Sequence, residues 1–153
     1  MAAELTDEAD LHLLIDGQRV NGLARPDGVH EFRLPQPPTG ARIVSRACVP
    51  EASGLTRDRR QLGVALRRIV VWRGRRLRVW EADNPALTEG FHAFESAHGF
   101  RWTNGDAALP PSLFEGLAGT CTIELTVGCT ARYPIAPSAE RRRATRSERQ
   151  RAA

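Results

Sequence analysis

A chain of 153 residues, 41% of them hydrophobic, can bury one ordinary core but not two, so we expect a single domain. It has no apolar run near the ~18 residues of a membrane span and no signal peptide, so we expect a soluble chain, cytoplasmic by default. The net charge of +4 comes from residues 139–153, which contain six Arg together with Glu140 and Glu148. The 16 basic and 16 acidic residues of the rest of the chain balance, and this balance argues against a nucleic-acid clamp.

The first elements in chain order predict β-structure. Residues 1–10 are acidic and are expected to be flexible. Leu11–Ile15, the turn signal Asp16-Gly17 and residues 18–23 then predict a hairpin. Val29–Leu34 alternates between apolar and polar residues, which is typical of a half-buried strand.

The middle of the chain predicts a central hairpin. Arg42–Ala47 is strand-like, and Leu62–Trp72 is the most apolar segment, rich in β-branched residues. Gly74 separates Leu62–Trp72 from the alternating residues Arg76–Glu81. A helix over Leu62–Trp72 is the alternative, because its apolar residues would also line one helical face.

The C-terminal half continues with loops and short strands. Asn84-Pro85 opens a long loop, and Phe100 and Trp102 share one face of a short strand that Asn104-Gly105 ends. Ser112–Leu117 predicts one helical turn, and Thr122–Val127 alternates as a strand does.

Together these segments predict an all-β fold of eight to ten short strands. We expect a single antiparallel β-sandwich of jelly-roll type over residues 11–137, after the flexible residues 1–10. Residues 138–153 contain no large apolar side chain, so we expect a disordered Arg-rich tail there. Weak contacts with nucleic acid are expected only through Arg141, Arg142 and Arg143, and a solvated terminus is the alternative.

The three cysteines predict buried structural thiols. Cys48, Cys121 and Cys129 lack the C-x-x-C spacing of zinc or dithiol sites. On a continuous strand, Cys121 and Cys129 would share the core-facing parity of Ile123 and Leu125.

No catalytic motif is present, and every basic residue is Arg, which excludes a Schiff-base or P-loop lysine. We therefore expect a protein that is not an enzyme and has no cofactor. His92, Glu95 and His98 have a spacing that would suit zinc only on a helical turn, which Gly90 and Gly99 disfavour, so no metal is expected.

The segment from residue 91 to residue 106 is the best candidate for ligand binding. An exposed Trp102 ring could pack on a sugar, and polar side chains beside it could bind the sugar hydroxyls. Core packing of Phe100 and Trp102 is the alternative, because their spacing also suits the buried face of a strand. The predicted ligand-binding residues are His92, Glu95, Arg101, Trp102, Asn104 and Asp106.

A family resemblance rests on the ordered segments DLHLLIDGQRV, RIVSRACVP, DRRQLGVALRRIVV, ADNPALTEGFHAFE, RWTNGDAALP and ARYP. Residues 11–134 resemble the β-rich region that follows the Hint (Hedgehog/intein) domain in certain alphaproteobacterial proteins. GFHAFE and RWTNGDAALP also resemble β-sandwich modules attached to polysaccharide glycosyltransferases. The catalytic Hint module itself does not precede Leu11, so self-cleavage is not transferred to this chain.

The resemblance implies a non-catalytic accessory module that binds carbohydrate or a partner protein. The alternative is a structural or protein-interaction domain of a Hint-type protein that has no small-molecule ligand.

Overall fold

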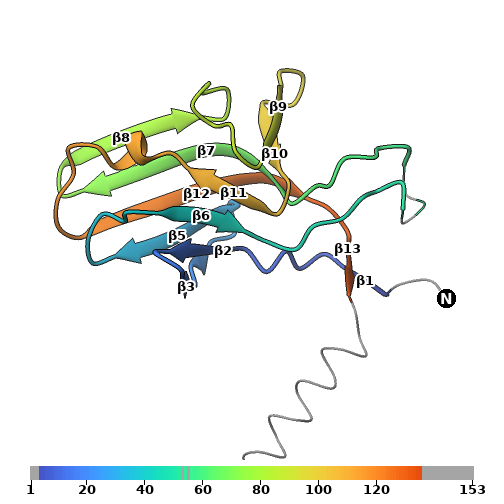
Figure 1. Cartoon of the computed structure of the whole chain (residues 1–153), viewed down its shortest axis with the longest axis horizontal. Coiled ribbons are helices and arrows are strands. Elements are labelled where there is room, and N and C mark those ends of the chain that lie inside the picture. The colour runs from blue at the N-terminus through green and yellow to red at the C-terminus, as the bar shows by residue number, and fades with distance from the viewer. Residues whose placement is uncertain (1–3, 53, 55, 136–153) are drawn as a thin grey trace, which may run out of the picture.

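The computed structural model describes residues 4–52, 54 and 56–135, and these residues form an all-β fold with antiparallel sheets (Figure 1). Two sheets face each other in a sandwich, as the alternating sequence predicts. Within the described residues, no helix is long and apolar enough to cross a membrane. The predicted tail over residues 138–153 lies outside the described part of the chain.

The larger sheet has seven strands. Its hydrogen-bonded order is β4-β5-β12-β7-β10-β9, and β8 also pairs with β7. This branch arises because β10 pairs with the start of β7, at Ala65 and Leu66, whereas β8 pairs with Arg68–Arg73 along the same edge. The strands are β4 (Leu23–Ala24), β5 (Val29–Leu34), β7 (Val64–Arg73), β8 (Arg76–Glu81), β9 (Phe91–Glu95), β10 (Phe100–Thr103) and β12 (Cys121–Thr130).

The smaller sheet has four strands in the order β11-β6-β2-β3. They are β2 (His12–Ile15), β3 (Gln18–Val20), β6 (Ala41–Val44) and β11 (Asp106–Leu109). A separate pair joins β1 (Glu4–Thr6) to β13 (Tyr133–Ile135), so the folded part begins before Leu11. One 3-10 turn, η1 (Pro111–Phe114), overlaps the first half of the helical turn predicted over Ser112–Leu117.

The main core lies between the two sheets and draws residues from both. On β12, the alternation places Ile123 and Leu125 inside and Thr122 and Glu124 at the surface. The fully or largely buried members of this cluster are Leu13, Phe32, Leu34, Ala41, Ile43, Leu66, Ile69, Val71, Leu87, Leu109, Leu113, Phe114, Cys121, Ile123 and Leu125.

The predicted strands are confirmed, and the helix alternative for Leu62–Trp72 is wrong. β5 has the predicted bounds Val29–Leu34, and β7 and β8 form the predicted central hairpin. The predicted long loop after Asn84 is shorter than expected, because β9 pairs with β10 inside it. β11 was also missed, since DAAL has little β-propensity and gains its ladder from β6.

Cys129 corrects the prediction of three buried thiols. Cys48 and Cys121 are buried, but Cys129 is exposed. The register between β12 and β7 shifts twice, between Thr126 and Val127 and again between Val127 and Cys129. Such β-bulges break the two-residue alternation, so Cys129 no longer follows the inward parity of Cys121.

Candidate functional site

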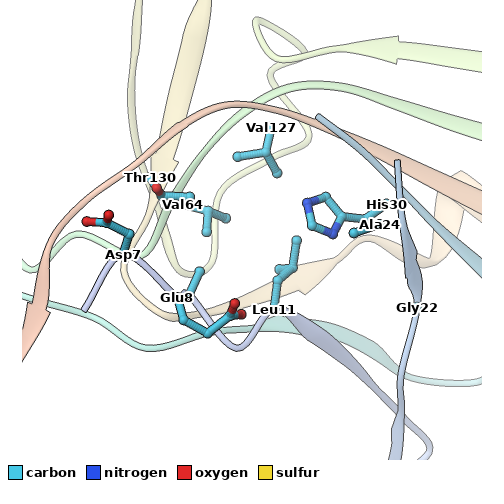
Figure 2. A pocket seen from close by; sticks show the side chains of 10 residues that line it. Asp7, Glu8, Leu11, Gly22, Ala24, His30, Val64, Val127 and Thr130 are labelled. Carbon is cyan, nitrogen blue, oxygen red and sulfur yellow. The ribbon is translucent and has the colours of Figure 1, made fainter. Parts of the chain in front are cut away.

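A cavity of about 310 Å³ opens at the end of the sandwich beside the N-terminal segment (Figure 2). We call it the N-terminal pocket. It lies where β4, β5, β7 and β12 meet the chain between β1 and β2. Its lining residues are Asp7, Glu8, Ala9, Leu11, Gly22, Ala24, His30, Val64, Val127 and Thr130.

Local hydrogen bonds fix the acidic wall of this pocket. The Glu8 N–H donates to Thr6 Oγ1 at 3.1 Å, and the Asp10 N–H donates to Glu8 Oε1 at 3.1 Å. Arg46 then anchors the segment to the smaller sheet, because its Nη1 donates to the Glu8 carbonyl at 2.9 Å and its N–H donates to the Ala9 carbonyl at 2.7 Å. Residues 7–11 are thus held in place as one side of a defined cavity.

His30 forms the opposite wall. It lies on β5 across from Leu125, on the face of the sheet that points into the sandwich, and its ring projects into the pocket (Figure 2). Burial lowers the pKa of His30, and the negative charge of Glu8 opposes this with a smaller effect. At neutral pH the imidazole is therefore uncharged, with one nitrogen as donor and the other as acceptor.

The bulges in β12 shape the third wall. They fall on either side of Val127, whose N–H donates to the Gly28 carbonyl at 2.9 Å. With Leu11 and Val64, Val127 lines the cavity with apolar groups. The pocket therefore combines an apolar surface with the Glu8 carboxylate, an imidazole and the hydroxyl of Thr130, whereas the Asp7 carboxylate points away from the cavity toward Arg132 (Figure 2). This lining suits a small ligand that has both C–H and hydroxyl groups.

The predicted aromatic platform lies elsewhere and is turned inward. Trp102 is only 8% exposed and packs edge-on against Phe100, with ring centroids 5.8 Å apart. Both residues belong to a second core cluster around the buried Tyr133, as the core-packing alternative describes. In this structure the Trp102 ring offers no open face to a sugar.

Arg101 serves as a clamp for backbone carbonyls. Its Nε donates to the Ala82 carbonyl at 2.7 Å, and its Nη1 donates to the carbonyls of Leu87 and His92 at 3.3 and 3.2 Å. The guanidinium ties the loop before β9 to the β9–β10 hairpin. These contacts use the donors of Nε and Nη1, which leaves the two N–H groups of Nη2 for any ligand.

His92 and Glu95 of β9 each contact the loop that precedes β7. His92 Nε2 is 2.6 Å from the Gln61 carbonyl oxygen. Arg60 bridges two carboxylates, because it pairs with Asp58 at 2.8 Å and has Nη1 3.6 Å from Glu95 Oε2, an oxygen that is buried without a hydrogen bond. The Arg60 guanidinium lowers the pKa of Asp58. This network orders the loop.

Asn104 and Asp106 occupy the turn between β10 and β11. Asn104 Oδ1 accepts the Asp106 N–H at 2.9 Å, and the Asp106 carboxylate pairs with Arg42 at 2.6 Å. These contacts tie the six predicted residues to different parts of the fold, and none of the cavities described here with linings drawn from residues 4–135 includes any of them. In the described ranges, no group of His, Cys, Asp and Glu side chains could hold a metal ion.

Sequence reasoning missed the N-terminal pocket because its parts are distant in the chain. Asp7 and Glu8 fall in the segment predicted to be flexible. Val127 lines the cavity at a point where β12 has two bulges, and no local sequence pattern predicts these bulges. One signal was available: His30 shares the inward parity of Phe32 and Leu34. A histidine at an inward position needs a polar partner or access to a cavity, because a buried polar group without either is unfavourable.

Neither the family models, nor the curated proteins, nor the solved structures contain a match to this chain.

Proposed function

We propose that the chain is a non-catalytic accessory module that binds carbohydrate, and that the N-terminal pocket holds one sugar unit. The observation that carries this proposal is the cavity of about 310 Å³ with both apolar and hydrogen-bonding walls. Its volume is at the lower end of the ~300–1,000 Å³ typical of small-molecule sites, so a single ring suits it better than an extended chain.

The chemistry of the walls matches a sugar. The Glu8 carboxylate can accept hydrogen bonds from hydroxyl groups, and a neutral His30 both donates and accepts. Leu11, Val64 and Val127 can cover the C–H face of the ring. The resemblance to regions that follow Hint domains, and to modules of polysaccharide glycosyltransferases, supports an accessory role for the same module.

Retention on immobilised saccharides tests this proposal. Ala24 is an exposed residue of the pocket wall, so Ala24→Phe should fill the cavity without disturbing the core and should weaken retention by ~10-fold or more. Ala93→Phe places the same side chain at an exposed position of β9 and should leave retention unchanged. Equal retention of both variants would contradict a site in the N-terminal pocket.

Removal of residues 138–153 separates this site from binding by charge alone. Binding in the pocket should survive the deletion, because the lining residues all lie before residue 131. Binding that depends on the arginines of the tail should disappear with them, together with its salt dependence. A folded protein retained by no saccharide would overturn the carbohydrate proposal.

A further inference from the structure

The N-terminal pocket carries a negative charge that no neighbouring arginine neutralises. None of its ten lining residues is an arginine, although the chain contains 22 of them. Asp7 has Arg132 Nε 3.5 Å from its Oδ1 and points away from the cavity (Figure 2). Among the described residues, no basic side chain lies within ion-pair distance of the Glu8 carboxylate. Glu8 is therefore the charged group that the pocket presents to a ligand.

The Glu8 carboxylate is held in position and still has acceptor capacity. Its Oε1 accepts the Asp10 N–H at 3.1 Å, which occupies one of the about four lone-pair sites of a carboxylate. Arg46 Nη1 donates to the main-chain carbonyl of Glu8 at 2.9 Å, so this bond fixes the backbone and leaves the carboxylate oxygens to other donors. The charge is thus placed at the cavity by a local turn and a backbone anchor.

The other polar side chains of the cavity are acceptors as well. His30 projects into the cavity from the wall opposite Glu8 (Figure 2), and the neutral ring has one nitrogen with a free lone pair. The Thr130 hydroxyl adds two more lone pairs at the exposed mouth. A primary ammonium group has three N–H donors, no acceptor and one positive charge. Three acceptors, one of them anionic, therefore match an ammonium group better than they match a hydroxyl.

The apolar walls and the size of the cavity restrict the ligand further. Leu11, Val64 and Val127 need C–H groups to cover them, which a simple amine does not supply. A sugar acid would bring its own carboxylate close to Glu8, and like charges repel. An N-acetylated sugar has no charge and adds an acetyl group to a cavity of only about 310 Å³. A sugar ring with a free amine satisfies all three conditions.

We propose that the N-terminal pocket is specific for an amino sugar, whose free ammonium group pairs with the Glu8 carboxylate. This inference rests on the proposed carbohydrate function and names the class of sugar. A hydrogen bond between two charged groups is about twice as strong as one between neutral groups. The amino sugar should therefore bind ~10-fold or more tightly than the same sugar with an acetamide or a hydroxyl group in place of the amine.

Calorimetric titration of the full-length protein with three short oligosaccharides of the same linkage tests this specificity. These are oligomers of glucosamine, of N-acetylglucosamine and of glucose, at a pH that keeps the amine charged. Glu8→Gln removes the charge but keeps an oxygen that can accept the Asp10 N–H. It should weaken binding of the glucosamine oligomer by ~10-fold or more and leave the other two unchanged. Added salt should also weaken only the glucosamine oligomer, because Glu8 is exposed.

The adjacent carboxylate supplies a matched control. Asp7→Asn removes the same charge one residue earlier, where the side chain points away from the cavity (Figure 2), and it should leave the preference for the amino sugar unchanged. Ala24→Phe, which fills the pocket, should weaken binding of all three oligomers. Asp7, Glu8 and Ala24 are all exposed, so circular dichroism should show an unchanged fold in each variant.

The outcomes separate this inference from the function on which it rests. Equal binding of the three oligomers, lost in Ala24→Phe, would overturn the specificity and leave the pocket as a sugar site. A preference that persists in Glu8→Gln would place the recognition of charge elsewhere and overturn the assignment to Glu8. Ethanolamine that binds as tightly as the glucosamine oligomer would show that the sugar ring is not recognised. A folded protein that binds none of the oligomers would overturn the carbohydrate function itself.

Discussion

At the scale of single residues, His30 couples folding to pH. Its pKa is lowered in the folded state by burial, so the unfolded chain takes up the proton first as the pH falls. Stability should be full above the unfolded value of ~6.5 and should be lost progressively as the pH drops through the lower folded pKa. His30→Gln should remove this part of the pH dependence of the urea midpoint.

The exposed His98 provides the control for this experiment. His98→Gln should keep the slope of the urea midpoint that the native protein shows below ~pH 6.5. If His30→Gln keeps that slope as well, the coupling belongs to another group.

Tyr133 is a second residue with a defined energetic role. Its hydroxyl donates to the Gly63 carbonyl and accepts the Ala131 N–H at 3.1 Å. Burial raises the pKa of Tyr133 to about 12, so the phenol stays protonated and remains a donor. Tyr133→Phe leaves both backbone groups without this partner and should lower the free energy of unfolding by about 1–3 kcal/mol in urea denaturation. An unchanged midpoint would show that neither hydrogen bond contributes.

At the scale of elements, Arg101 holds the β9–β10 hairpin to the preceding loop. Arg101→Met keeps the aliphatic stem but loses the donors to the carbonyls of Ala82, Leu87 and His92, and it should cost about 2–3 kcal/mol. Lys should not rescue the loss, since a point charge cannot reproduce the planar fork. Arg67→Met removes one exposed hydrogen bond, to the His98 carbonyl, and the contact of the guanidinium with the Phe100 ring at 5.7 Å, so it should lower the melting temperature less than Arg101→Met does.

Gly90, just before β9, tests the packing of the same hairpin against β11. It has a φ of +84°, and a Cβ there would collide with the backbone of Asp106 and Ala107. Gly90→Ala should therefore cost more than the ~1–2 kcal/mol of left-handed backbone strain alone. Gly74→Ala, at φ +58° in open space, should cost only that strain. Equal melting temperatures for the two variants would contradict the close approach.

The elements also show how far local sequence determines structure. Val29–Leu34 alternates between inward and outward residues, and the observed strand β5 begins and ends at the two residues predicted. β9 and β11 were missed because FHAFE and DAAL become strands only through partners, β10 and β6. Pairing energy that comes from another strand, whether the next one along the chain (β10) or a distant one (β6), leaves no periodic pattern in the strand that receives it.

At the scale of the whole molecule, one shared core predicts cooperative unfolding. Leu13 and Ile43 of the smaller sheet pack in the same cluster as Phe32 and Ile123 of the larger one, so neither sheet can bury its apolar face alone. Urea transitions followed by tryptophan fluorescence and by far-ultraviolet circular dichroism should coincide. Two separated transitions would show that the sheets unfold independently.

The amino-acid sequence by itself determined the all-β class, the central hairpin and the inward face of each regular strand, because a period of two residues is a local property of the chain. Only the tertiary structure decided the surfaces available to a ligand. Trp72 and Trp102 both sit in apolar β-strands, yet one faces solvent and the other the interior. Which face of a sheet is covered depends on the layer that packs against it, and that layer comes from distant parts of the chain.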